Sequence, residues 1–297
     1  MTIKLGVIGS SSGNGHPYSW SAIFNGYDHK FMKDCGYPVI PEYLEKESWP
    51  EARILDAEVT SIWTQDKTLS EKIAEASLIK HVSSNLTELE QRVDAVLLAR
   101  DDSENHLEFA LQFLKVGKPI YIDKPIALSI SSLNELYRHQ QYEGQIFTCS
   151  ALRYSPELFL TIEDRKEIGE IISISSSTPN SWKKYSVHII EPVLAMLSSS
   201  DNPKRIERVS DAKDISTLKV EWESGIETSF STLGNVKEPI SIKVVGLNGE
   251  IELIFENTFT AFKNALQDFV NGITDGECKS PFEFNAKVVN LIERGIK

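Results

Sequence analysis

The chain of 297 residues lies at the upper end of what one hydrophobic core usually serves, so its length favours two domains. Hydrophobic residues make up 41% and charged residues 25%, which excludes a disordered, collagen-like or membrane-spanning composition. The 31 Lys and Arg against 43 Asp and Glu give a net charge of -12. Because no long basic run offsets this charge, we expect no non-specific binding of nucleic acid or of an anionic membrane. A net negative charge is still compatible with a single basic pocket that binds a phosphate.

The cysteines and the first residues bear on the cellular compartment. Cys35, Cys149 and Cys278 are odd in number, far apart and without a C-x-x-C pair, which favours a reducing compartment. The start, MTIKLGVIGSSSG, has one lysine and a short apolar run broken by Gly6, too short for a secretory segment. No run of about 18 apolar residues follows it. We therefore expect a cytoplasmic protein without a membrane span.

The first half of the chain predicts strands that alternate with helices. Short apolar runs that end at turn residues are typical of buried parallel strands, and apolar positions three or four apart are typical of helices. Asn85 is expected to cap one helix, with Glu88 at capping-box spacing, and Gly117 to end another. In chain order we expect strands at 3–9, 59–63, 79–82, 94–98 and 119–122, and helices at 69–76, 86–92 and 104–116. This order predicts a doubly wound parallel sheet with its ligand site beyond the carboxyl ends of the strands.

After about residue 145 apolar and polar residues alternate, which is typical of antiparallel strands with one wet face. We expect strands at 171–177, 206–209, 216–222, 225–232, 240–247 and 250–255, and helices at 187–197, 259–271 and 284–294. The predicted fold class is α/β. An N-terminal Rossmann-type dinucleotide-binding domain at 1–123 is followed, at 124–297, by a C-terminal α+β domain for substrate binding and oligomerisation, with a largely antiparallel open sheet.

The first turn, Gly9-Ser10-Ser11-Ser12-Gly13-Asn14-Gly15, follows the first strand. A dinucleotide turn uses glycines where the backbone is tight and where it approaches the diphosphate. Here Ser11 stands in place of the second glycine and Asn14 in place of the third, while Gly13 suggests a lengthened turn. Two interpretations stay open. The hydroxyls and N–H groups hold a phosphate, or the segment is a plain turn from strand to helix.

Charged residues follow three further strands. Asp66, after the second, could bind a ribose 2′-hydroxyl and so favour NAD over NADP, or simply cap the next helix. Arg100, after the fourth, faces the same crevice but lies beside two acids, as in many solvated loops. Asp123-Lys124-Pro125 follows the fifth strand. The Lys124 ammonium could donate to a substrate hydroxyl or carbonyl there, although surface lysines are common.

Several segments together resemble one family. The run VDAVLLARDDSENHLEFALQFLKVGKPIYIDKPIA is similar to the strand, helix, glycine, strand and E-K-P of the Gfo/Idh/MocA oxidoreductase family, with Asp123 for the Glu and His106 near its helix-start histidine. SALRYSPELF and IGEIISISS resemble the start of its second domain. Tyr185-Ser186-Val187-His188, followed by IIEPVLAML, resembles its D-x-G-x-H helix. By their order and spacing, the chain is identified as a divergent, short member of this family.

The resemblance implies an NAD(P)-dependent oxidoreductase that acts on a hydroxyl of a sugar, cyclitol or nucleotide-sugar. Because of Asp66 after the second strand, we expect NAD rather than NADP as its cofactor, and we expect no metal site. By this resemblance Lys124 would hydrogen-bond the reacting oxygen. His188 would be the general acid/base beside the nicotinamide, whereas on an apolar helix alone it would read as a buried structural histidine. The cofactor-binding residues would be Gly9, Ser11, Gly13, Asn14, Asp66, Arg100, Asp123 and Lys124.

The chain departs from the family pattern at Lys184, in place of the motif's Asp, and at Ser186, in place of its Gly. Lys184, Tyr185 and Arg153 are candidates for binding an anionic substrate such as a nucleotide-sugar. The segment His16-Pro17-Tyr18-Ser19-Trp20 is not explained by the family, and either lines the pocket or packs the first helix.

Two functions therefore compete: a dehydrogenase or reductase, and a catalytically inactive dinucleotide- or sugar-binding or regulatory protein of the same fold. We also expect a homo-oligomer, because the alternating strands after residue 145 leave a second face that a small domain cannot cover with its own helices.

Overall fold

The computed structural model describes residues 2–212 and 215–297. Its internal contacts divide the described residues into two compact units. Unit 1 comprises 2–127, 134–148 and 265–281, and unit 2 comprises 128–133, 149–264 and 282–297. Both units therefore combine segments that are distant in sequence. The predicted division into a cofactor-binding domain at 1–123 and a substrate-binding domain at 124–297 stays a prediction.

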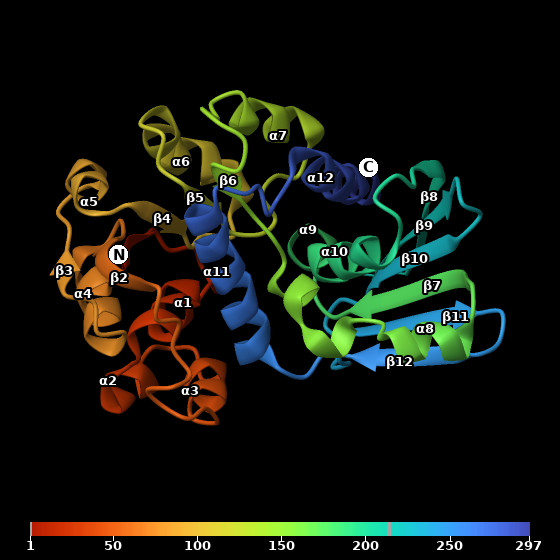
Figure 1. Ribbon diagram of the computed structural model, residues 1–297, viewed down its shortest axis with the longest axis horizontal. Coiled ribbons are helices and arrows are strands. Elements are labelled where there is room, and N and C mark those ends of the chain that lie inside the picture. Colours follow the sequence, from red (N-terminus) through yellow and green to blue (C-terminus); the bar gives the residue numbers. More distant parts are fainter. Residues whose placement is uncertain (1, 213–214) are drawn as a thin grey trace. The chain divides into compact units, whose positions relative to one another are not determined.

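Unit 1 is built on a parallel sheet of six strands in the order β3-β2-β1-β4-β5-β6 (Figure 1). Every paired neighbour in it is parallel. The order changes direction between β1 and β4, and in such sheets this switch point is where ligands bind. The strands are β1 Ile3–Ile8, β2 Ala57–Trp63, β3 His81–Val82, β4 Ala95–Leu98, β5 Ile120–Ile122 and β6 Ile146–Phe147. The predicted doubly wound parallel sheet is confirmed.

The helices of unit 1 cover this sheet. Helices α1 and α4 contact each other, α5 packs on β1 and β2, and α6 packs on β4 and β5. The bounds are α1 His16–Asn25, α2 His29–Lys33, α3 Val39–Leu44, α4 Lys67–Ala76, α5 Leu86–Arg92, η1 Ser103–Asn105 and α6 His106–Lys115. Helices α7 Ile130–Tyr137 and α11 Thr258–Asp275 each contribute residues to both units.

Local sequence signals explain where these helices begin and end. The Asn85 side chain accepts a bond from Glu88 N and caps α5, as predicted. The Glu88 carboxylate, however, accepts from the backbone N–H of Ser84 at 2.8 Å rather than from that of Asn85, so the capping box is displaced by one residue. Gly117, with φ +74°, adopts the left-handed conformation expected after α6.

Unit 2 contains a second sheet of six strands, in the order β12-β11-β7-β10-β9-β8. The neighbouring pairs are antiparallel except β7 with β10, which are parallel. The prediction of a largely antiparallel sheet is confirmed. The parallel pairing of β7 with β10 departs from a sheet in which every strand would be antiparallel to its neighbours. It arises because β7 enters the middle of the sheet and the chain returns beside it only after β8 and β9. The strands are β7 Ile171–Thr178, β8 Pro203–Ala212, β9 Ile215–Trp222, β10 Glu227–Thr232, β11 Ser241–Gly246 and β12 Glu250–Ile254.

One face of this sheet carries the core of unit 2. Helix α10 contacts β7 and β11, and α12 contacts β8 and β9. Between them lie buried apolar side chains that include Ile174, Leu218, Phe230 and Val244. The helical elements of unit 2 are η2 Ala151–Tyr154, η3 Pro156–Leu158, α8 Ile162–Ile168, α9 Trp182–Tyr185, α10 Val187–Met196 and α12 Phe282–Ile296.

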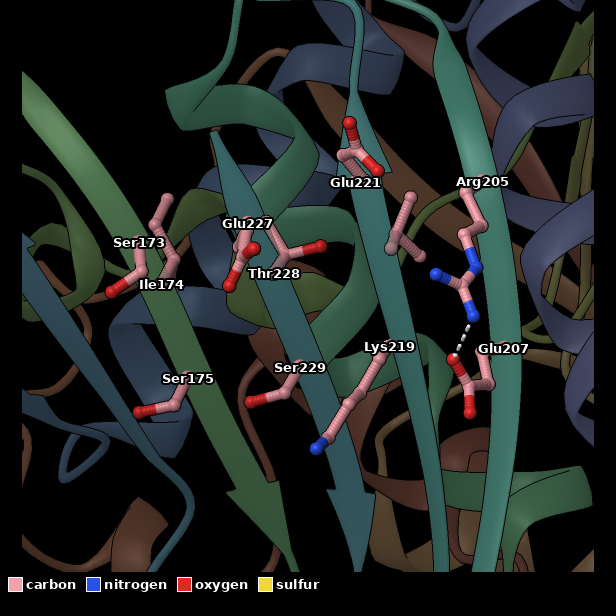
Figure 2. A pocket seen from close by; sticks show the side chains of 11 residues that line it. Ser173, Ile174, Ser175, Arg205, Glu207, Lys219, Glu221, Glu227, Thr228 and Ser229 are labelled. Carbon is pink, nitrogen blue, oxygen red and sulfur yellow. Dashed lines mark hydrogen bonds and ion pairs between the residues drawn. The ribbon is translucent and has the colours of Figure 1, made fainter. Parts of the chain in front are cut away.

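The opposite face of the second sheet is polar. Figure 2 shows a shallow hollow there, where Ser175 and Ser229 lie on neighbouring strands and Arg205 pairs with Glu207 at 2.9 Å. Lys219 lies between these groups on β9. The predicted wet face is therefore confirmed, and hydroxyl and charged side chains predominate in the hollow, which Ile174 and Val220 also line. Within the described residues, no helix has the length and apolar character that crossing a membrane requires.

Candidate functional site

The turn after β1 is shaped by Gly9. Its φ is +76°, and a Cβ placed there would lie 2.6 Å from Cδ of Arg100, so only glycine fits. Gly13, with φ +82°, has open space around it. Gln65 fastens the turn to the end of β2, because its side chain accepts from Ser10 N and donates to Ser10 O, both at 3.3 Å. The turn is thus a rigid backbone cradle at the carboxyl edge of the sheet.

Two acids and one arginine support this cradle. The Ser11 hydroxyl donates to Asp101 at 2.6 Å and accepts from the Asp101 backbone N–H at 3.1 Å. The Arg100 guanidinium, almost fully buried, pairs with Asp102 through Nε at 2.9 Å and through Nη2. Burial opposes ionisation of Asp102, but the bonds from Arg100 and Asn105 outweigh it and lower its pKa.

The Arg100 side chain lies against Gly9, and one of its guanidinium nitrogens, Nη1, is not used in the hydrogen bonds described above. Its guanidinium carbon lies 4.4 Å from the centre of the Phe109 ring, which fixes its plane. Its Nη1 is buried and has no hydrogen-bond partner among the described residues. A positive charge under a glycine cradle offsets Asp101 and Asp102, which would otherwise repel an anion bound on the turn. The residues present therefore fit a dinucleotide diphosphate.

Asp66 lies after β2, as predicted. Its carboxylate caps α4 by accepting from Thr68 N at 2.8 Å and Leu69 N at 3.4 Å, through the same oxygen Oδ1. The capping interpretation is thus confirmed. The ribose interpretation stays a prediction, and the exposed position of Asp66 is compatible with both.

A cluster of hydrogen bonds surrounds Asp123 at the end of β5. Its side chain is 1% exposed, and its Oδ2 accepts from Asn14 Nδ2 at 2.8 Å and lies 2.6 Å from His16 Nδ1. Its Oδ1 accepts from the backbone N–H of Lys124 at 2.7 Å. Burial alone would raise the pKa of Asp123, but the charges of His16 and Lys124 and these bonds lower it to about 2. Asp123 is therefore an ionised carboxylate at neutral pH.

The structure brings together most of the cofactor-binding residues predicted in unit 1. Gly9, Ser11 and Arg100 meet at the first turn, and Asn14 and Lys124 meet around Asp123. His106, the family's helix-start histidine, is buried, with its ring nitrogens 2.7 Å from Arg100 O and 3.0 Å from Ile126 O. It therefore holds together the segments after β4 and β5, from which Arg100 and Lys124 project.

In unit 2, His188 lies in the first turn of α10. Its Nδ1 is 2.8 Å from the hydroxyl of Ser150, which is fully buried and caps η2 by accepting from Leu152 N. The Tyr185 ring meets the His188 ring edge-on at 5.4 Å between centroids. Lys184 is half-buried in the short helix α9, which precedes α10. His188 is thus held through one nitrogen by a neutral hydroxyl.

Arg153 is largely enclosed within unit 2. Its side chain is 11% exposed; Nε lies 3.7 Å from the Glu191 carboxylate, and Nη2 donates to the Tyr154 hydroxyl at 3.0 Å. The guanidinium also lies 4.7 Å from the centre of the Phe284 ring. Burial raises the pKa of Glu191 to about 7 against the opposing attraction of Arg153, and its Oε2 has no hydrogen-bond partner among the described residues. The Arg153 guanidinium therefore already has a buried carboxylate, that of Glu191, as its neighbour within unit 2.

Three residues of these clusters are not singled out by sequence analysis alone: His16, Ser150 and Glu191. His16 lies in the segment His16-Pro17-Tyr18-Ser19-Trp20, for which the sequence leaves open a place in the pocket or in the packing of the first helix. Ser150 and Glu191 lie three residues from Arg153 and His188 respectively, on elements that pack together. That equal spacing was the available signal, because residues three apart share a helix face.

Comparison with known proteins defines the class and then the family. A family description, "Oxidoreductase family, NAD-binding Rossmann fold" (GFO_IDH_MocA), matches residues 3–150. The protein is thus an NAD-binding oxidoreductase by class, and the chain belongs to the Gfo/Idh/MocA family, as its sequence predicted. No curated protein matches the sequence.

Solved structures share the fold at low identity. Scyllo-inositol dehydrogenase from Lactobacillus casei, with bound NAD(H) and scyllo-inositol, is 14% identical, with a TM-score of 0.73 over 98% of this chain and 95% of that one. Myo-inositol 2-dehydrogenase from Lactobacillus plantarum is 13% identical, with a TM-score of 0.72 over 99% and 96%. GenD2 from gentamicin A biosynthesis, in complex with NAD, is 14% identical, with a TM-score of 0.70 over 100% and 94%. At such identities the likeness concerns the fold.

Proposed function

We propose that this protein is an NAD-dependent dehydrogenase that transfers a hydride between nicotinamide and a hydroxyl carbon of a cyclitol, sugar or nucleotide-sugar. The observation that carries the proposal is Asp123-Lys124 at the carboxyl end of β5 in a Rossmann sheet whose first turn is a glycine cradle. The names of the structural neighbours, which include two inositol dehydrogenases, support a polyol substrate.

The cofactor would be held by unit 1 alone. The backbone of Gly9, Ser11 and Gly13 would surround the diphosphate, with Arg100 beneath it. Asp66 would bind the adenosine ribose, since Oδ1 makes both capping bonds and leaves the second oxygen for a hydroxyl. A carboxylate there repels a 2′-phosphate, so NAD is favoured over NADP. When bound, the nicotinamide supplies the hydride acceptor or donor.

This chain's own residues would handle the proton. Lys124, fixed at its backbone by the ionised Asp123, would donate to the reacting oxygen and stabilise charge that develops on it. His188, fixed at Nδ1 by Ser150, would take the hydroxyl proton at Nε2 during oxidation and return it during reduction. Lys184 and Tyr185 would contact an anionic or polar substrate. Arg153, held by its contacts with Tyr154 and Glu191, would add a positive charge to this substrate-binding surface.

Calorimetry with NADH and NADPH, followed by turnover of a panel of cyclitols, sugars and nucleotide-sugars, tests this proposal. We expect tighter binding of NADH and NAD-dependent oxidation of at least one polyol. A preference for NADPH would contradict the Asp66 assignment. The alternative, a non-catalytic binding or regulatory protein, is favoured by Lys184 in place of the motif's acid. It predicts cofactor binding without hydride transfer to any member of the panel.

We also propose a cytoplasmic homo-oligomer. The cysteines are odd in number, far apart in sequence and without a C-x-x-C pair, which fits a reducing compartment. The polar face of the second sheet, with Ser175, Ser229 and Lys219, would be the contact surface (Figure 2). Such a contact would be hydrogen-bonded and charge-matched rather than apolar. Light scattering at micromolar concentration measures it, and a monomer would contradict it.

A further inference from the structure

His16 begins α1 at the carboxyl edge of the first sheet, and the proposed function gives it no task. Its Nδ1 lies 2.6 Å from Oδ2 of Asp123, and its side chain is 16% exposed while that of Asp123 is 1% exposed. Asn14 is tied to both partners, since its Nδ2 donates to Asp123 and its Oδ1 accepts from the backbone N–H of His16. His16 is therefore built into the same cluster as Lys124.

The charge of Asp123 decides which ring nitrogen of His16 carries a hydrogen. An ionised carboxylate only accepts hydrogen bonds, so a 2.6 Å contact to His16 requires a proton on Nδ1. In the neutral ring Nε2 is then an acceptor, and in the protonated ring it is a donor. In either state Nε2 is suited to a hydroxyl, which both donates and accepts.

Aromatic packing fixes the plane of the His16 ring. The ring stacks on Trp20 with centroids 4.8 Å apart and an interplanar angle of 14°. Trp20 in turn stacks on Tyr121 of β5 at 4.7 Å, and both of these side chains are 1% exposed. Because Asp123 holds Nδ1 and Trp20 holds one face, the direction of Nε2 is set before any ligand arrives.

The strand order indicates which part of a dinucleotide meets this ring. In the order β3-β2-β1-β4-β5-β6, the acid for the adenosine ribose follows β2 and the diphosphate cradle follows β1. The other half of the dinucleotide must then extend over β4 and β5. Asp123, which holds His16, directly follows β5.

We propose that His16 is a cofactor-binding residue whose Nε2 hydrogen-bonds a hydroxyl of the nicotinamide-side ribose, with Asp123 as its positioning residue. All four residues of the cluster belong to unit 1, so the contact depends on the dinucleotide and not on the substrate. The proposal rests on the proposed function for the presence of the dinucleotide, but not for hydride transfer.

Binding of three nucleotides to His16→Gln tests this contact. NADH and ADP-ribose contain the second ribose, whereas ADP ends at the diphosphate. We expect His16→Gln to weaken binding of NADH and ADP-ribose by roughly 3- to 10-fold, the size of one hydrogen bond, and to leave ADP within about twofold. The matched control is His81→Gln, because His81 also lies 2.6 Å from a carboxylate, that of Glu88, but at the β3 edge of the same sheet. It should bind all three nucleotides like the wild type.

The outcomes separate this inference from the proposed function. A wild type that fails to bind NADH overturns both. A wild type that binds NADH, with an unchanged affinity in His16→Gln, overturns only the His16 contact, and an equal loss for ADP moves the contact to the diphosphate and also overturns it. Should His16→Gln not fold, nitrogen NMR of histidine-labelled wild type decides. Nδ1 of His16 must carry the proton, and the Nε2 signal must move with ADP-ribose but not with ADP.

Discussion

Each unit contains a deeply buried carboxylate, Asp123 beside His16 in unit 1 and Glu191 three residues after His188 in unit 2, and the pKa values of the two shift in opposite directions. Asp123 is 1% exposed and Glu191 is 3% exposed, yet the pKa of Asp123 is lowered to about 2 and that of Glu191 is raised to about 7. Asp123 has two charged neighbours, His16 and Lys124, and three hydrogen bonds. Glu191 has one cation at 3.7 Å and an oxygen without a partner. The number of donors, rather than burial, therefore decides which carboxylate is charged.

This difference extends to the two histidines. The partner of His16 is the ionised carboxylate of Asp123, whereas the partner of His188 is the neutral hydroxyl of Ser150. The proposed role of His188 as general acid/base requires that its Nε2 exchange a proton with the substrate. In the proposed function, unit 1 therefore contributes a fixed charge, and unit 2 would contribute the group that takes up and returns the proton.

The largest expected effect is on turnover. If the proposed function holds, His188→Ala and Lys124→Ala should each reduce the rate of hydride transfer by at least about 100-fold, because each removes a group that is proposed to act on the reacting oxygen. Both variants should still bind NADH. NADH absorbance with the active polyol measures the rate, and calorimetry measures the binding.

The exposed His29 offers a control for these variants, since its side chain is 64% exposed. His29→Ala should keep the wild-type rate. A His188→Ala variant as active as the wild type would show that unit 2 does not supply the proton-transfer group, and the contrast between the two units would fail.

The next effect concerns stability in acid. Asp123→Asn should lower the free energy of unfolding at pH 7 by about 2 kcal/mol, since one pKa unit corresponds to about 1.4 kcal/mol. The folded pKa lies below the ordinary value of 3.8, so this stabilisation is complete above that pH and is lost as the pH falls through about 2. Urea unfolding of both proteins between pH 7 and acid measures it. A constant difference across that range would contradict the assigned charge.

Glu191→Gln should change the free energy of unfolding in the opposite direction, that is, raise it. The folded pKa of Glu191, about 7, lies above the ordinary 4.5, so the ionised form costs stability that appears as the pH rises from 4.5 through 7. A neutral amide avoids that cost but loses the attraction of Arg153. We expect a gain of about 1 kcal/mol at pH 8 that disappears below about pH 4.5. A loss of stability at pH 8 would show that Arg153 and Glu191 form a charged pair.

The fold was predictable because its signals are local. The apolar runs of β1 and β4, the Asn85 cap and Gly117 can each be read from a few adjacent residues, and each is confirmed. The short helices α2, α3 and α8 were not predicted, because five to seven residues do not complete a periodic pattern. The parallel pairing of β7 with β10 joins strands that are far apart in the chain. The turn residues between consecutive strands, from which hairpins are predicted, carry no information about such a pair.

The candidate site was predictable only in part, for the same reason. Lys124 and Asp123 follow a recognisable strand and motif, so their place at the sheet edge could be expected. The contact of His16 with Asp123 joins residues 107 apart, and that of Ser150 with His188 joins residues 38 apart. Arg153 was expected to meet a substrate, whereas its partner Glu191 lies on another element and is ordinary in sequence.

The smallest expected effect is that of Ser150→Ala. This change leaves Nδ1 of His188 without its 2.8 Å partner, so the ring can adopt the other tautomer or rotate. Loss of one neutral hydrogen bond corresponds to roughly a 3- to 10-fold decrease in kcat, with KM unchanged, and Ser150→Thr should restore part of it. Ser176→Ala is the matched control, because the Ser176 hydroxyl is also buried in unit 2 but donates to Ser229 O. Nitrogen NMR should show a changed tautomer ratio for His188 in Ser150→Ala only. A drop in kcat without that change would assign Ser150 to packing, and the neutral partner of His188 would then no longer explain how unit 2 differs from unit 1.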